Sequence, residues 1–227
     1  MARSKILRMN GDVREHPRYS VEDAARYLHI PISTMRAWVS GYKRRNRNTG
    51  KVRRFDPLIT PADPKKNLLS FYNLAEAHVL RSTRDRQVPL VNLRRAMEYI
   101  RQYMRSDYPL ISNDFATSGQ DMFVTHLGQT INASKAGQVA MHAILNEYLH
   151  RIERDASGMP TQFSPFHSVH LNINPRVSSG SPVIRGSGVM VSVVLARKES
   201  GESLPELARD FGLSTSDIEE AIREYAA

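Results

Sequence analysis

The sequence predicts a mainly α-helical fold with short β-hairpins, arranged as an N-terminal winged helix-turn-helix and a small C-terminal module that also resembles a helix-turn-helix. Two observations support this prediction. Apolar residues recur at helical spacing in most segments of the 227-residue chain. Glycine-centred turns between short runs interrupt these segments and indicate hairpins. We expect three regions, at residues 1–107, 108–165 and 166–227.

Positive charge is concentrated at the N-terminal end of the chain. Residues 1–54 contain 14 Lys and Arg against 4 Asp and Glu, whereas residues 55–227 contain 18 against 19. The net charge of +9 therefore comes from the first quarter of the chain. A basic head on a neutral body is typical of a module that binds a polyanion such as nucleic acid. The alternative at this point is a disordered basic arm.

The composition excludes several other classes of protein. The chain has no cysteine, so disulfides, thiolate metal sites and a cysteine nucleophile are excluded. Its first residues lack the apolar run of a signal peptide. No stretch approaches the roughly 20 apolar residues of a membrane span. We therefore expect a soluble protein of the cytoplasm, with no membrane contact.

Residues 19–42 have the pattern of two short helices joined by a tight turn. Ser20 is a candidate N-cap of the first helix, and Asp23 is placed to complete a variant capping box. The apolar residues that follow the i, i+3, i+4, i+7 rule are Val21, Ala24, Ala25 and Leu28. Pro31 ends this helix and leads into the second one.

The second helix has an apolar face and a polar face. It is predicted to begin at Ile32 or Ser33 and to end near Gly41. Its apolar residues are Met35, Trp38 and Val39, which would pack on the first helix to form a helix-turn-helix. Its exposed residues are Ser33, Thr34 and Arg36, which suit base edges and phosphates. We expect this helix to bind DNA; the alternative is a helical hairpin within a core.

A strongly basic segment follows the second helix. Its cationic residues are Lys43, Arg44, Arg45, Arg47, Lys51, Arg53 and Arg54. Asn48-Thr49-Gly50 lies between them and predicts a turn, so the segment is expected to form a hairpin, or wing, beside the helix. Such a wing would reach phosphates or the minor groove of DNA. The alternative is a solvated charged loop.

Two amphipathic helices are predicted next, at residues 70–81 and 90–104. This order of elements resembles the DNA-binding head of the MerR family, in which supporting helices follow a helix-turn-helix and a wing. The resemblance covers residues 18–104, and three motifs carry it: Tyr19-Ser20-Val21, the segment 32–36 with Trp38, and the 69–80 helix. The wing is longer and more basic than is usual in that family.

The middle region has a less regular pattern. Residues 114–124 and 128–133 are expected to form short strands, with turns at Ser118-Gly119 and Leu127-Gly128. Residues 140–152 have the spacing of an amphipathic helix. His167 and His170 stand at i, i+3, which is half of a metal-binding pattern. No carboxylate or second pair accompanies them, so we expect no metal or other cofactor.

The C-terminal region contains three predicted helices, at residues 192–199, 204–211 and 216–226. Gly201 and Gly212 would end the first two. The charged residues of the last helix are Asp217, Glu219, Glu220, Arg223 and Glu224. Phosphates would be repelled by this acidic surface. We therefore expect the module to form protein–protein contacts, including a homodimer; the alternative is a second DNA-reading unit.

An unusual motif, Gly-x-Pro-Val-Ile-x-Gly, occupies residues 180–186 of this region. Asn174-Pro175-Arg176 precedes it, and Gly201-Glu202-Ser203-Leu204 follows it. In this pattern the last 55 or so residues are similar to a small bacterial domain, long catalogued as one of unknown function, that is found in antitoxins encoded beside PIN-domain ribonuclease toxins. Ser187-Gly188 stands where that family typically has Thr-Arg.

A MerR-like head joined to this tail resembles the larger VapB-type antitoxins. The resemblance implies a homodimer that binds double-stranded operator DNA, represses its own operon and neutralises a PIN-domain ribonuclease toxin. An arginine of the antitoxin would enter the carboxylate cluster of the nuclease. Arg176 and Arg185 are the candidates for this partner contact.

Two alternative classes of function can be weighed against this one. The first is a stand-alone MerR-like transcriptional regulator whose middle region binds a small effector. The second is an enzyme, which we do not expect because the sequence shows no nucleophile motif, phosphate-binding loop or metal-spaced cluster.

Overall fold

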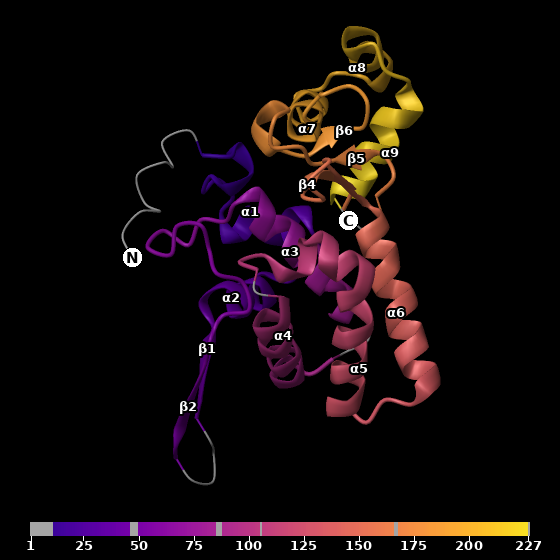
Figure 1. Ribbon diagram of the computed structural model, residues 1–227. Coiled ribbons are helices and arrows are strands. Elements are labelled where there is room, and N and C mark those ends of the chain that lie inside the picture. Colours follow the sequence, from indigo (N-terminus) through magenta and orange to yellow (C-terminus); the bar gives the residue numbers. More distant parts are fainter. Residues whose placement is uncertain (1–10, 46–49, 85–87, 105, 166–167, 227) are drawn as a thin grey trace.

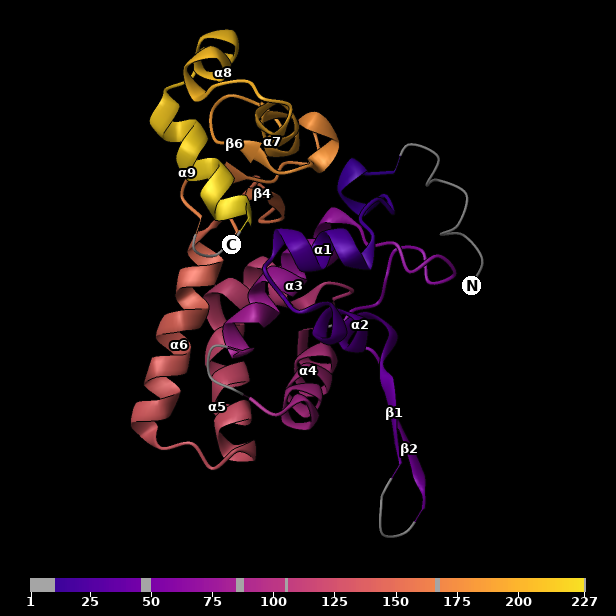
Figure 2. The ribbon, with the colours of Figure 1, turned by 180° about the vertical axis from the view of Figure 1, so that it is seen from behind.

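The computed structural model describes residues 11–45, 50–84, 88–104, 106–165 and 168–226. The fold is mainly α-helical and contains short antiparallel strand pairs. A hairpin made of β1 (Tyr42–Arg45) and β2 (Val52–Phe55) projects from the body. The C-terminal helices gather at the opposite end of the molecule, as the front and back views show (Figures 1 and 2).

The predicted helix-turn-helix is present at the N-terminal end. It consists of α1 (Val21–Tyr27) and α2 (Ile32–Ser40), preceded by a 3₁₀ turn at Val13–Glu15. Ser20 caps α1, because its Oγ accepts a hydrogen bond from the backbone N–H of Asp23 at 2.9 Å. The capping box is a variant one, in which the Ser20 hydroxyl donates to the Asp23 carboxylate at 2.7 Å. The apolar faces of α1 and α2 pack together and are buried.

Gly41 fixes the angle between α2 and the hairpin. Its φ of 66° and ψ of −168° belong to a region that is essentially restricted to glycine. A Cβ atom at this position would lie 2.2 Å from the carbonyl oxygen of Phe55. The chain then returns to the end of α2, where the N–H groups of Leu58 and Ile59 both donate to the carbonyl of Trp38. The hairpin is therefore attached to α2 at both of its ends.

Four longer helices form the centre of the molecule: α3 (Phe71–Arg84), α4 (Leu90–Met104), α5 (Gln120–Thr130) and α6 (Lys135–His150). Helix α3 is buried over almost its whole length and packs on α6, while α5 lies between α4 and α6 (Figures 1 and 2). The predicted helices at residues 70–81 and 90–104 are confirmed. The one predicted at 140–152 begins earlier than expected, at Lys135, and ends at His150.

The expectation of strands at residues 114–124 and 128–133 is wrong. A π-helical turn at Phe115–Gly119 runs into α5, and a 3₁₀ turn at Pro109–Ile111 precedes it. The two glycines interpreted as turn residues are sites of close helix packing instead. A Cβ atom on Gly119 would lie 2.3 Å from Cε of Met104, and one on Gly128 would lie 2.6 Å from Cγ of Gln138. A larger residue at either position would have to displace these neighbouring side chains.

The C-terminal part contains short strands followed by three helices. The strands pair as two antiparallel hairpins: β3 (Ile152–Arg154) with β4 (Pro160–Phe163), and β5 (Leu171–Asn172) with β6 (Val183–Ile184). A 3₁₀ turn at Ser178–Gly180 precedes β6. The helices are α7 (Val191–Glu199), α8 (Leu204–Phe211) and α9 (Thr215–Ala226), within one residue of the predicted bounds. Ser203 and Glu206 form a full capping box on α8, and Gly212 ends it in the left-handed conformation.

Buried apolar residues form two clusters. The larger one extends from Tyr19 to Ile173 and joins the helix-turn-helix to the central helices, so the expected boundary at residues 107–108 falls inside it. The smaller one extends from Leu171 to Ile222 and lies within the C-terminal helices and their strands. The three expected regions therefore share two cores, and their boundaries stay predictions.

Candidate nucleic-acid interface

Helix α2 presents a polar face to solvent next to a surface hollow. Its buried residues are Met35, Trp38 and Val39, as expected. Ser33, Arg36 and Ser40 lie on the outer side and line a hollow of about 570 Å³. Lys66 and Asn67, from the loop before α3, line the same hollow. The hollow thus brings two cations, Arg36 and Lys66, and several hydrogen-bonding groups to the helix that is expected to enter a DNA groove.

Arg36 is held by an ion pair across the helix-turn-helix. Its Nη2 lies 2.8 Å from Oε1 of Glu22 on α1, and the two side chains are 61% and 57% exposed. The hydrogen bond from Arg36 lowers the pKa of Glu22. An ion pair this exposed contributes little to stability. The guanidinium is thus oriented over α2 and remains accessible to another anion.

Thr34 is less available than the sequence suggested. It is half-buried, and its Oγ1 accepts a hydrogen bond from Nη1 of Arg84 at 2.7 Å. Arg84 is exposed at the end of α3 and brings a further cation to the edge of α2. Sequence reasoning missed Arg84, because its place beside Thr34 depends on how α3 packs.

Stacked aromatic rings hold the base of the wing. Tyr42 and Phe55, which are opposite each other in the strand register, have ring centroids 4.7 Å apart at an interplanar angle of 20°. The guanidinium of Arg94 on α4 lies over both rings, at 4.8 Å from Tyr42 and 5.4 Å from Phe55. Arg94 also donates to the carbonyl of Asp56 at 2.8 Å. Cation–π contacts and hydrogen bonds thus connect the wing to the helical body.

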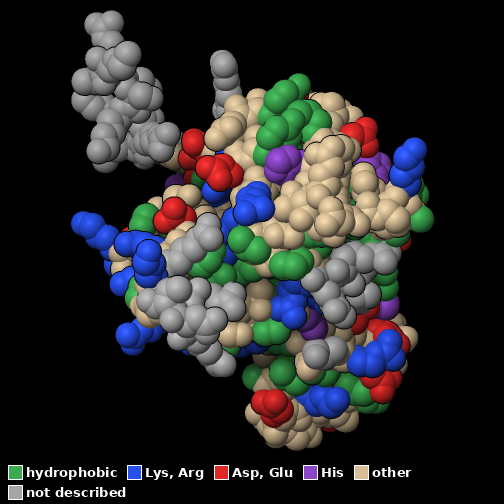
Figure 3. All heavy atoms as spheres, turned by 90° about the horizontal axis from the view of Figure 1, so that it is seen from below, with side chains coloured by type: hydrophobic (Ala, Val, Ile, Leu, Met, Phe, Trp, Pro, Cys, Tyr) green, Lys and Arg blue, Asp and Glu red, His purple; other side chains and the backbone are tan. Residues whose placement is uncertain are grey.

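The wing carries its positive charge on exposed side chains. These are Lys43, Arg45, Lys51 and Arg54 among the residues whose side chains are described. Lys43 is opposite Arg54 in the register, and like charges in this position destabilise an isolated hairpin. The predicted contacts Arg47 and the side chains of Arg44 and Arg53 lie outside the described part of the structure. Seen from below, Lys and Arg side chains gather at the wing side of the molecule (Figure 3).

Two further groups of cations flank the wing and were not predicted. On one side, a hollow of about 460 Å³ is lined by Arg54, Arg95 and Arg101 together with the acidic Asp56 and Glu98. On the other side, the exposed residues Lys65 and Lys66 lie on a loop that the Asp63 carboxylate orders by accepting from both of their N–H groups. The lysine pair after Pro64 was the available sequence signal for this second group.

The two candidate partner-binding arginines lie in different settings on the C-terminal module. Both side chains are exposed. Arg185 donates to the hydroxyl of Ser164 and lines a surface hollow, whereas the backbone N–H of Arg176 donates to Oδ1 of Asn174. Arg176 is not among the residues that line this hollow.

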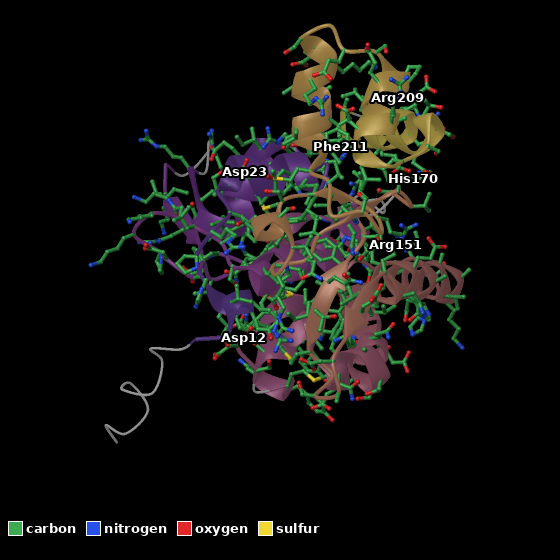
Figure 4. The ribbon with its side chains drawn as sticks, turned by 90° about the horizontal axis from the view of Figure 1, so that it is seen from above. Asp12, Asp23, Arg151, His170, Arg209 and Phe211 are labelled. Atoms are coloured by element: carbon green, nitrogen blue, oxygen red, sulfur yellow. The ribbon has the colours of Figure 1, made fainter. Side chains whose placement is uncertain are left out.

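His170, one of the two histidines at i, i+3 spacing, has structural partners. His170 Nδ1 lies 3.1 Å from Oε1 of Glu224 on α9, and Ser168 also donates to this carboxylate at 2.6 Å. Arg151, at the end of α6, donates to the carbonyl of Ser168 at 2.8 Å, so His170 and Arg151 mark the joint between α6 and the tail (Figure 4). His167 lies outside the described residues. Elsewhere in the described ranges, no three His, Asp or Glu side chains gather as a metal site would require.

The tail also touches the helix-turn-helix directly. Tyr27 of α1 and Tyr225 of α9 have ring centroids 6.4 Å apart, and the Arg26 guanidinium lies 5.8 Å from the Tyr225 ring. Nη1 of Arg18 donates to the carbonyl of Pro175 at 3.2 Å. These contacts cover part of the outer side of α1, at Tyr27, and leave the outer side of α2 open.

Two family models match the chain. One, described as "Putative DNA-binding HTH domain", matches residues 17–97, which include α1, α2, the wing, α3 and part of α4. The N-terminal part is a helix-turn-helix domain. The other, described as "Protein of unknown function (DUF433)", matches residues 171–226, which include β5, β6 and the three C-terminal helices.

Individual proteins of Mycobacterium tuberculosis are similar over nearly the whole chain. "Putative antitoxin VapB45" is 28% identical over 244 aligned positions that cover all of both chains. "Uncharacterized protein Rv2308" is 27% identical over 222 positions, covering 90% of this chain and 88% of that one. The crystal structure of Rv2018 shares the fold, with a TM-score of 0.68 and 22% identity over 91% of this chain and 98% of that one.

No helix in the described part of the chain combines the length and the apolar character needed to cross a lipid bilayer.

Proposed function

We propose that this chain is the antitoxin of a VapBC-like type II toxin–antitoxin pair, which binds its own operator DNA and neutralises a PIN-domain ribonuclease in the cytoplasm. The observation that carries the proposal is the similarity to "Putative antitoxin VapB45", because that alignment covers the helix-turn-helix region and the tail in one chain. The match to a DNA-binding helix-turn-helix model supports the operator contact.

Operator recognition belongs to α2 and the MerR-like wing. Helix α2 would lie in the major groove, with Ser33 and Arg36 directed at base edges and phosphates. Lys43, Arg45, Lys51 and Arg54 would follow the phosphate backbone or the minor groove beside it. The like-charge pairing of Lys43 with Arg54 supports this, because a phosphate between the two strands would remove the repulsion.

Repression would require a homodimer. A single helix-turn-helix covers one half-site, so bacterial operator readers generally use two-fold symmetry. The tail offers two exposed apolar side chains for such an interface, Val169 at 59% and Val193 at 36% exposure. The edge of β6 is already used within the chain, because Val183 forms a bridge with Met190.

A combined binding and growth experiment tests the proposal. The purified chain should retard a DNA fragment from its own promoter, and light scattering should give the mass of a dimer. The product of the adjacent gene should arrest growth by cutting RNA when expressed alone, and coexpression of this chain should restore growth. Rescue should persist with Arg36→Ala, since the DNA and toxin surfaces are separate. Operator binding without any complex with that product would support the stand-alone regulator instead.

A further inference from the structure

A row of polar side chains crosses the outer face of the small strands in the C-terminal part. A bridge between Phe163 and Ile173 joins the β3–β4 hairpin to the β5–β6 hairpin, with N–H···O distances of 3.1 and 2.9 Å. Phe163 and Ile173 point into the core. Because neighbouring residues of a strand face opposite ways, Gln162, Asn172 and Asn174 point outward.

These outward groups are connected to one another. The Gln162 carbonyl accepts from Nδ2 of Asn172 at 2.8 Å and from Nδ2 of Asn174 at 3.0 Å, while its Nε2 donates to the Glu153 carboxylate at 2.6 Å. The row lines a hollow of about 420 Å³, which Arg185 lines as well. Hydrogen bonds between side chains of β3, β4 and the β5 segment therefore fix this surface before any ligand arrives.

Several hydrogen-bond donors of the hollow are not used by the bonds described. The Gln162 oxygen already accepts two bonds, which fills its capacity. Each of the three amide nitrogens keeps a second N–H beyond the bonds described. Arg185 makes one described side-chain hydrogen bond, to Ser164, and no carboxylate of the described residues lies within ion-pair distance of it. A ligand rich in acceptors, with at least one negative charge, matches this surface.

The shape of the hollow suits an extended chain. Strands lie about 4.8 Å apart, so a row across four strands extends about 14 Å, the length of about four extended residues. Gly186 and Gly188 form part of the lining with no side chain above the backbone. A Cβ atom on Gly186 would have no neighbour within 4 Å, so the lining is open on that side.

The charge of the surrounding module favours a protein over nucleic acid as the ligand. Residues 171–226 contain six Lys and Arg against eight Asp and Glu, and Glu153 stands at one end of the hollow. A polyanion would be repelled by this module, whereas a segment with one or two carboxylates would meet Arg185.

We propose that the hollow lined by Glu153, Gln162, Asn172, Asn174 and Arg185 binds an extended acidic segment of the protein partner. The inference rests on the proposed function for the existence of that partner and adds the place and chemistry of the contact. In this arrangement Arg185 pairs with a carboxylate of the segment, and the amide row donates to its backbone carbonyls.

Two arginines provide a matched test. The native chain and its Arg185→Glu and Arg209→Glu variants would be titrated with the product of the adjacent gene by isothermal titration calorimetry. Arg185→Glu is expected to weaken binding at least about tenfold, because the reversed charge faces a carboxylate. Arg209→Glu changes the net charge equally at an exposed position of α8 outside the hollow, and the affinity should stay within about twofold of native. Thermal unfolding would establish that both variants are folded.

A second variant tests the amide row without a change of charge. Asn172→Leu removes the two N–H donors of one side-chain amide from the hollow. It should weaken binding about three- to tenfold. Native affinity in both Arg185→Glu and Asn172→Leu would overturn the inference while leaving the proposed function standing. Failure of the native chain to bind the product would overturn the proposed function and the inference together. Loss of operator binding by Arg185→Glu, with partner binding intact, would assign the hollow to DNA and also overturn the inference.

Discussion

Arg36 and Glu22 form an ion pair of 2.8 Å that joins the outer face of α2 to α1. Both side chains are more than half exposed, so the pair holds the guanidinium over α2 without burying it. DNA that enters the hollow beside α2 would bring phosphates close to both groups. The carboxylate therefore competes with DNA for Arg36, and two substitutions can separate these effects.

Arg36→Ala should weaken operator binding about tenfold and reduce the slope of log affinity against log salt by roughly one unit, because one cation no longer releases a counterion. Glu22→Gln should tighten binding, because it removes a carboxylate that repels phosphate and frees Arg36. Fluorescence anisotropy at several salt concentrations measures both quantities. An unchanged slope in Arg36→Ala would remove this residue from the interface.

The wing should contribute several phosphate contacts at once. Replacement of Lys43, Arg45 and Arg54 by alanine should lower the salt slope by roughly three units, at about 0.9 per lost contact. The matched control replaces three exposed cations elsewhere, Lys135, Lys198 and Arg209. It removes the same charge and should leave the slope nearly unchanged. Equal effects in the two triple variants would mean that net charge, rather than the wing, governs affinity.

Gly41→Ala should destabilise the protein and weaken DNA binding. Its backbone conformation is nearly exclusive to glycine, and the new Cβ would collide with the Phe55 carbonyl, so the free energy of unfolding should fall by about 2–3 kcal/mol. Gly212→Ala is the control, since its φ is also positive but no atom lies within 4 Å of the added Cβ. Gly212→Ala should lower the free energy of unfolding by about 1 kcal/mol. Urea unfolding measures both; equal costs would contradict the steric argument.

Glu76 should make the protein less stable as the pH rises. Burial on α3 raises the pKa of this carboxyl from 4.5 to about 8. Between these values the folded chain keeps a proton that the unfolded chain has lost, so the free energy of unfolding falls by about 1.4 kcal/mol per pH unit in that window. Below pH 4.5 both states are protonated and the effect vanishes.

Glu76→Gln removes this titration. Urea unfolding at about pH 5, 6.5 and 8 samples this window. The free energy of unfolding of Glu76→Gln relative to the native chain should therefore increase with pH. Glu98→Gln, at an exposed position of α4, serves as the control for the loss of one carboxylate. A pH-independent difference for Glu76→Gln would mean that the carboxyl is ionised in the folded protein.

The parts of the fold that sequence predicted correctly depend on local patterns. The spacing of Val21, Ala24 and Ala25, the cap at Ser20 and the turn at Gly41 are all encoded within a few residues. The same applies to α8, whose capping box and terminal glycine lie in one ten-residue segment. Such elements form because each backbone hydrogen-bond group finds its partner nearby.

The failed predictions concern residues whose role depends on a distant neighbour. Gly119 and Gly128 are ordinary turn signals in isolation, but Met104 and Gln138 occupy the space where their side chains would be. Likewise, Arg84 joins the candidate interface because α3 places it beside Thr34, fifty residues earlier in the chain. No short-range pattern contains this information.

The contact between Tyr27 and Tyr225 has a consequence for the order of folding. The two rings meet although they are 198 positions apart in the chain, so a ribosome must synthesise all the intervening residues before Tyr27 gains this cover. Contacts of such long range are costly to close and form late. During translation the outer side of α1, with Tyr27, is therefore open to chaperones and proteases until α9 emerges, whereas the contacts between α1 and α2 can form as soon as both helices have left the ribosome.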